Sequence, residues 1–120
     1  MLTISLANNK EIKIMSEFMI TYHGGKAPET KEEGQKAMAE WKAWAESLGE
    51  ALTNPGTPVG KTKVLTSKGV SNEPSPNPLM GFSIVEAAHI EAALDLIKDC
   101  PHLKYEGTLE VSEMWQMTLD

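Results

Sequence analysis

The amino-acid sequence predicts one α+β domain in which four antiparallel strands and two helices follow the order βαββαβ. The chain has 120 residues, close to the commonest size of a single domain. Residues 30–48 carry apolar side chains at helical spacing, and stretches rich in β-branched and aromatic residues lie on both sides of them. Because crossover connections are right-handed, both helices should cover one face of the sheet and leave the other open.

Residues 1–14 differ in character from the rest of the chain. They either form a small hairpin that turns at Asn8-Asn9 or are an upstream extension before a second possible start at Met15, and the extension is favoured. We therefore expect an N-terminal segment of residues 1–15 and a domain of residues 16–120.

The first strand and first helix carry clear boundary signals. Residues 17–23 (EFMITYH) predict a strand that ends at Gly24-Gly25. Thr30 and Glu33 match a capping box at the start of the helix, and Gly49 suits its C-terminal cap. One apolar stripe of this helix is expected to face the core; it comprises Met38, Trp41, Trp44, Ala45 and Leu48. Trp115 either belongs to the core or lines a cleft, and core packing is favoured.

The middle of the chain is rich in turn residues. Residues 54–60 are punctuated by glycine and proline, so the second strand region is expected at residues 61–66, with a hairpin turn at residues 67–69. Residues 71–78 contain three prolines and predict an exposed loop.

The C-terminal part repeats the strand–helix–strand plan. Residues 80–86 predict a third strand and residues 108–117 a fourth. A helix is expected over residues 89–100, begun by His89 and stopped by Pro101. Its buried side should comprise Ile90, Ala93, Leu94 and Ile97.

Composition excludes several classes of partner and site. The formal net charge is −6 and all 11 basic residues are lysines, which argues against nucleic-acid binding because that function leans on basic patches and arginine. Cys100 is the only cysteine, so neither an intrachain disulfide nor a cysteine-based metal site is possible. No apolar stretch is long enough for a membrane helix. We expect a cytoplasmic protein without metal or cofactor.

An open sheet face needs a cover, and a second copy of the chain is the simplest one. The apolar residues expected on this face include Met19, Val85 and Met114. The sequence therefore predicts a homodimer that meets through its open sheet faces.

His23 is the main candidate for chemistry. Strand alternation places it with Met19 and Thr21 on the open face, beside a Gly24-Gly25 turn that lets a ligand approach the backbone. Imidazole can serve as a general acid or base near neutral pH. The alternative is a histidine that only bonds a loop carbonyl at the rim.

Neighbouring strand ends supply possible partners for His23. Pairing in the strand order 4-1-3-2 brings Asn77, Gly81, Thr108 and Glu110 near it, and Glu110 is the carboxylate best placed to orient an imidazole. A solvated glutamate on an edge strand is the alternative. Ser112 shares the polar face of Glu110, and Lys61, with Lys63 and Lys26, could hold an anionic ligand or be solvated. The three histidines have no metal-ligand spacing, so no metal site is expected.

Several blocks, in their order and spacing, resemble the YCII-related family. They are Tyr22-His23-Gly24-Gly25, Asn77-Pro78 with Gly81-Phe82, Cys100-Pro101-His102-Leu103, residues 106–111 (EGTLEV) and the helix around Trp41 and Trp44. The resemblance covers roughly residues 18–117. It implies a ferredoxin-like fold and a dimeric α+β barrel, in which two sheets face each other around a cleft.

The resemblance also bears on function. Some family members are thought to work through a His/Asp pair, whereas many have no assigned reaction. The Asp-Gly-Pro-Phe loop of part of the family is missing, and residues 71–78 stand in its place, so no catalytic aspartate is carried over. We expect a protein that binds an unidentified small molecule, either an enzyme with His23 as acid or base or a non-catalytic binding or regulatory module.

Overall fold

The computed structural model describes residues 2–6 and 12–117. The predicted turn at Asn8-Asn9 lies outside these residues. The strands are β1 (Leu2–Leu6), β2 (Ile12–Gly24), β3 (Leu52–Pro58), β4 (Val64–Thr66), β5 (Gly69–Ser71), β6 (Leu79–Ala87) and β7 (Gly107–Glu113). The helices are α1 (Lys31–Leu48), the 3-10 turn η1 (Gly49–Ala51), α2 (Ile90–Ile97) and α3 (Pro101–Lys104).

The main sheet is antiparallel and has β2 and β6 at its centre. β6 pairs with one edge of β2 and with β3, and β7 pairs with the other edge of β2. The four strands thus lie in the order β7-β2-β6-β3, which follows the predicted order 4-1-3-2 except that a different segment forms the strand beside β6. β1 pairs with the first part of β2, on the edge that β7 also uses.

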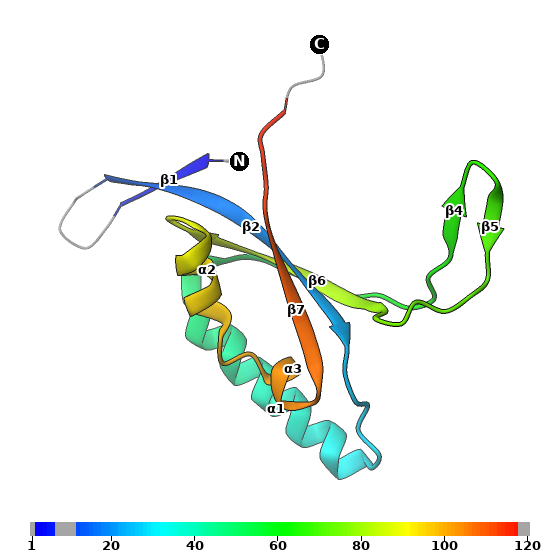
Figure 1. The fold of residues 1–120 in the computed structure, drawn as a ribbon. Coiled ribbons are helices and arrows are strands. Elements are labelled where there is room, and N and C mark those ends of the chain that lie inside the picture. The colour runs from blue at the N-terminus through cyan, green and yellow to red at the C-terminus, as the bar shows by residue number, and fades with distance from the viewer. Residues whose placement is uncertain (1, 7–11, 118–120) are drawn as a thin grey trace.

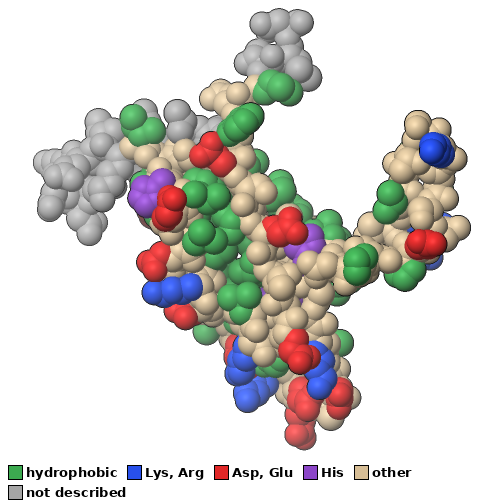
Figure 2. All heavy atoms as spheres, in the orientation of Figure 1, with side chains coloured by type: hydrophobic (Ala, Val, Ile, Leu, Met, Phe, Trp, Pro, Cys, Tyr) green, Lys and Arg blue, Asp and Glu red, His purple; other side chains and the backbone are tan. Residues whose placement is uncertain are grey.

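The helices lie on one face of this sheet (Figure 1). The β4–β5 hairpin forms a separate two-stranded sheet that projects from the body. Figure 2 shows hydrophobic side chains gathered between α2 and β7. None of the described helices is long and apolar enough to cross a membrane.

Alternation along β2 separates the core from the open face. Phe18, Ile20 and Tyr22 are buried under the helices, whereas Met19 and Thr21 between them are half-buried on the other face. This division is the one predicted from the sequence. It places the side chain of His23 on the open face.

The helix α1 begins and ends at the predicted caps. The Thr30 hydroxyl accepts a bond of 3.1 Å from the Glu33 N–H, and the Glu33 carboxylate accepts one of 2.9 Å from the Glu29 N–H. Gly49 follows with φ of 57°, and its N–H donates to the Glu46 carbonyl. Trp44 and Leu48 are buried as expected.

The predicted second strand is in the wrong place. Residues 61–66 contribute only to the β4–β5 hairpin, and the strand that pairs with β6 is β3. Its prolines and Gly56 argued against a strand, but β3 is an edge strand with irregular register, where proline and glycine are tolerated.

Several side chains lie differently from their predicted places. Val85 is fully buried under the helices, and its neighbours Phe82 and Ile84 take the open face instead. Short helices expose part of any apolar stripe, so Ile90 and Leu94 of α2 are 38% and 50% exposed. Met38 and Trp115, at 72% and 83%, are also outside the core.

β2 runs continuously across the predicted boundary between residues 15 and 16. The predicted second helix is divided in two. α2 ends at Ile97, and Pro101 occupies the first turn of α3 instead of only stopping a helix.

Candidate functional site

His23 lies near the end of β2, where the register with β6 shifts between Tyr22 and His23. Thr108 of β7 is its cross-strand partner. The imidazole is only 14% exposed because the loop before β6 and the side chains of β7 lie beside it. The site therefore forms where three segments distant in sequence meet.

The contacts of His23 fix the roles of its two ring nitrogens. Nδ1 lies 3.2 Å from the Asn77 carbonyl oxygen, which can only accept, so Nδ1 carries a proton. In the neutral ring Nε2 is then the basic nitrogen, and it receives a bond of 2.9 Å from the Thr21 hydroxyl. The Glu110 carboxylate lies 3.6 Å from the same Nε2. An imidazolium formed here would have that carboxylate beside it.

The loop that carries Asn77 is tied to both neighbouring strands. The Asn77 side-chain amide donates to the Thr108 hydroxyl at 3.3 Å, and the Gly24 N–H donates to the Pro78 carbonyl at 2.9 Å. These bonds hold the Asn77 carbonyl against His23. His23 therefore bonds a loop carbonyl, as the alternative role requires, and also lies beside the Glu110 carboxylate.

The structure brings together only part of the predicted site. His23, Glu110, Asn77 and Gly24 lie side by side. Ser112 is on the same face but pairs across from Met19, nearer the middle of β2. Lys61 is exposed in the segment between β3 and β4, and no contact joins it to His23 among the described residues.

Gly25 faces the opposite side of the sheet. Its φ is 97°, and a Cβ atom there would lie 2.7 Å from Cε1 of His102. The His102 Nε2–H donates to the His23 carbonyl at 2.9 Å. In the sequence analysis His102 is named only within the block of residues 100–103, and no sequence signal linked it to His23, because the contact joins α3 to the end of β2.

Two hollows lie on the helix-covered face, between α1 and the β3–β6 half of the sheet. Their volumes are about 620 and 510 Å³. The side chain of His23 lines neither hollow, although Tyr22, Gly24 and Gly25 line the larger one. Trp41 was expected in the core but is half-buried and lines both.

A chain of hydrogen bonds runs across the sheet side of these hollows. The buried Tyr22 hydroxyl donates to Ser83 Oγ at 2.8 Å, and Ser83 Oγ donates to the Pro55 carbonyl at 2.8 Å. Burial raises the pKa of Tyr22 to about 12, and the bond to Ser83 lowers it in part. Tyr22 therefore stays neutral and serves as a donor.

The remaining candidate residues have structural contacts. His89 caps α2, as predicted: its Nδ1 accepts a bond of 3.1 Å from the Ala92 N–H. Burial raises the pKa of the Cys100 thiol to about 11, which makes it a poor nucleophile. Within residues 2–6 and 12–117, no group of three or more His, Cys, Asp and Glu side chains could hold a metal ion.

Comparison with known proteins adds no further constraint, since no family model and no curated protein matches this sequence.

Proposed function

We propose that the protein binds a small organic molecule on its open sheet face, next to His23, with the His23–Glu110 pair as its acid–base group. The observation that carries this proposal is the approach of Glu110 to the basic nitrogen of His23 at 3.6 Å. The basic Nε2 of His23 could take a proton from a bound molecule and return it, with the Glu110 carboxylate beside the ring.

The fold proposed for this function is ferredoxin-like, with membership of the YCII-related family. Support comes from the antiparallel order β7-β2-β6-β3 with both main helices on one face. We further propose a homodimer in which two open faces meet. Met19, Phe82 and Ile84 give this face a half-buried apolar patch that a second copy would cover.

The surroundings of His23 suit proton transfer better than metal binding. Nδ1 is bonded to a backbone carbonyl, and Nε2 has a hydroxyl and a carboxylate beside it. The neighbouring apolar patch would hold the body of a ligand and exclude water from the polar end. A substrate with an acidic C–H or O–H next to a carbonyl fits these two requirements.

A thermal-shift screen against small keto acids, hydroxy acids and phenols tests the proposal. A compound that raises the melting temperature is then measured with His23→Gln and Glu110→Gln. We expect both variants to lose turnover, with His23→Gln also weakening binding. Glu113→Gln, on the same strand, is the matched control and should behave like the wild type.

The second candidate is a binding or regulatory module without catalysis. It is favoured by the three protein groups that already surround the imidazole. In that case the ligand would bind with unchanged affinity to Glu110→Gln, and no product would form with any variant. Equal shifts in wild type and His23→Gln would contradict a role of His23 in either function.

A further inference from the structure

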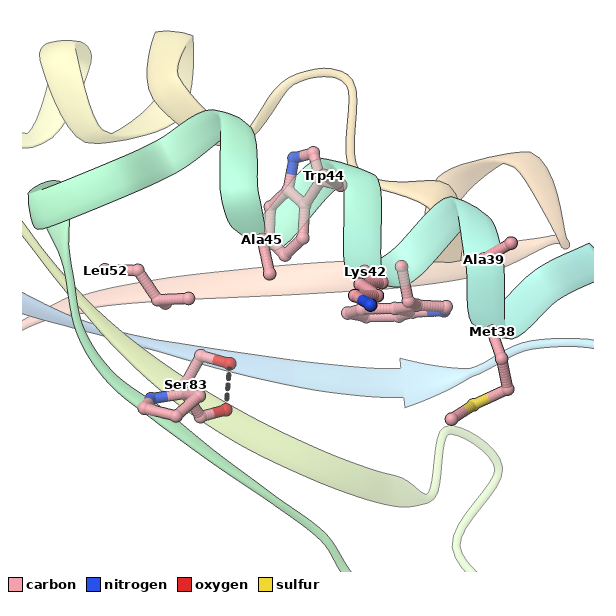
Figure 3. A pocket seen from close by; sticks show the side chains of 9 residues that line it. Met38, Ala39, Lys42, Trp44, Ala45, Leu52 and Ser83 are labelled. Carbon is pink, nitrogen blue, oxygen red and sulfur yellow. Dashed lines mark hydrogen bonds between the residues drawn. The ribbon is translucent and has the colours of Figure 1, made fainter.

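The two hollows on the helix-covered face are parts of one groove. Both are lined by Met38, Trp41, Pro55 and Ser83, so they meet at these residues. Figure 3 shows Met38, Lys42 and Ala45 along the α1 wall, with Ser83 on the strand below them. Each hollow lies within the ~300–1,000 Å³ range of small-molecule sites.

The shape of the groove is built into β3. The strand bulges between Asn54 and Thr57, and the Asn54 side chain accepts a bond of 2.8 Å from the Gly56 N–H. Gly56 has φ of 71°, and a Cβ atom at this position would overlap the Phe82 carbonyl. The bulge brings the Pro55 carbonyl to Ser83 Oγ, so these two polar atoms of the groove floor are hydrogen-bonded to each other.

The walls are apolar and partly adaptable. Tyr22 and Trp41 meet edge to face at 5.1 Å between ring centroids, and Trp41 meets Trp44 at 5.5 Å. Met38 is 72% exposed although it borders both hollows, which leaves a flexible thioether at the mouth. Such walls suit the hydrocarbon body of a ligand.

The acidic and basic side chains that line the groove have one sign of charge. Among the described residues that line it there is no Asp or Glu, and the lysines are Lys26 and Lys42. Lys26 is 3.7 Å from Glu29, whereas no ion pair or hydrogen bond involves the Lys42 side chain in the described part of the chain. A positive lining in a chain of net charge −6 is complementary to an anion.

We infer that this groove is a second ligand site, separate from His23, which binds an apolar organic acid with its hydrocarbon part against Trp41 and its carboxylate at Lys42. The site does not depend on the proposed acid–base function, because it lies on the other face of the sheet.

Binding of decanoate, decanol and decylamine to the full chain tests this inference. Decanoate should bind most tightly, and the amine should bind most weakly because of the lysines. Lys42→Gln should weaken decanoate about two- to fivefold, the range for one exposed ion pair, and leave decanol unchanged. Lys61→Gln changes an exposed lysine that does not line the groove, and it is the control for the change in net charge.

Two alanines of α1 provide a matched test of location. Ala45 lines the groove, whereas Ala43 is exposed and does not. Ala45→Phe should weaken decanoate about tenfold or more by filling the groove, and Ala43→Phe should not. In NMR spectra, decanoate should shift the indole signals of Trp41 and Trp44 but not that of Trp115.

Three results would overturn the inference. They are equal affinity for decanoate and decylamine, an equal loss in Lys42→Gln and Lys61→Gln, and shifts confined to Trp115. If Ala45→Phe fails to fold by circular dichroism, the Lys42 pair and the indole signals still decide the outcome. A stoichiometry of one decanoate per two chains, with dimer formation, would instead point to an interface between copies.

Discussion

The two faces of β2 use the same stretch of backbone for different purposes. On one face Phe18 and Ile20 have no exposed surface and Tyr22 very little. On the other, Met19 and Thr21 are half-buried and lead to His23 with its nearby carboxylate. Because successive side chains of a strand point to opposite faces, a shift of one residue in register would exchange the core with the candidate site.

Because the two faces differ in this way, we expect stability and ligand binding to respond to different substitutions in this strand. Substitutions on the covered face should change mainly the free energy of unfolding. Those on the open face should change mainly binding and assembly. Adjacent residues therefore form natural experimental pairs.

The largest effect is expected for Phe18→Ala. Its ring is fully buried, so the loss of packing should lower the free energy of unfolding by ~3–5 kcal/mol in urea titrations. Met19→Ala should cost only ~1 kcal/mol in the monomer, but it should weaken the proposed dimer in sedimentation measurements. If Phe18→Ala and Met19→Ala lowered the free energy of unfolding by similar amounts, the two faces would not differ in their contribution to stability.

A smaller effect is expected for Tyr22→Phe, which removes the bond to Ser83 but keeps the ring. The cost should be ~0.5–1.5 kcal/mol at neutral pH. The raised pKa of Tyr22, about 12 against an ordinary 10.0, adds stability below pH 10 that is lost as pH rises toward 12.

The difference between wild type and Tyr22→Phe should therefore shrink between pH 10 and 12, as followed by thermal melts. Thr21→Val, the neighbouring change on the open face, should leave the alkaline limb as in the wild type. A difference between wild type and Tyr22→Phe that stays constant over this range would show that the Tyr22 hydroxyl is not desolvated.

The smallest effect is expected at Glu40, which joins α1 to the end of α3 rather than to the sheet. Lys104 donates to it at 2.8 Å and Tyr105 at 2.7 Å, and these bonds lower the pKa of Glu40, with Lys104 the larger cause. The stability they add is present above the ordinary pKa of 4.5 and is lost as pH falls through the lowered value.

Glu40→Gln should therefore melt lower than the wild type at pH 7, and the two should converge on acidification. Tyr105→Phe, which keeps the Lys104 bond, should fall between them. Parallel melting curves from pH 7 to pH 3 would show that the ion pair does not contribute.

Local signals predicted most of this fold. Thr30, Glu33 and Gly49 set the ends of α1 through hydrogen bonds that reach only a few residues along the chain. The local sequence is therefore enough to predict where this helix begins and ends. The strand β3 was missed because its place depends on pairing with β6, which no local pattern records. Val85 was put on the wrong face because β6 carries apolar side chains on both faces, and only packing against α2 selects the buried one.

The candidate site was predictable to the extent that strand pairing brings it together. His23, Glu110 and Asn77 meet as the strand order requires. His102 could not be anticipated, since its bond to the His23 carbonyl depends on how α3 turns beneath β7. The groove was missed for a similar reason: its walls come from α1 and from an irregular edge strand.

The irregular β3 has a consequence for how this chain meets other chains. A free sheet edge invites a neighbouring strand to continue the ladder, and that is a common route to aggregation. Pro55 and Pro58 have no N–H, and the Gly56 N–H already donates to the Asn54 side chain. An incoming strand would find few donors along this edge. The same prolines that argued against a strand at β3 thus protect its edge from unwanted strand addition.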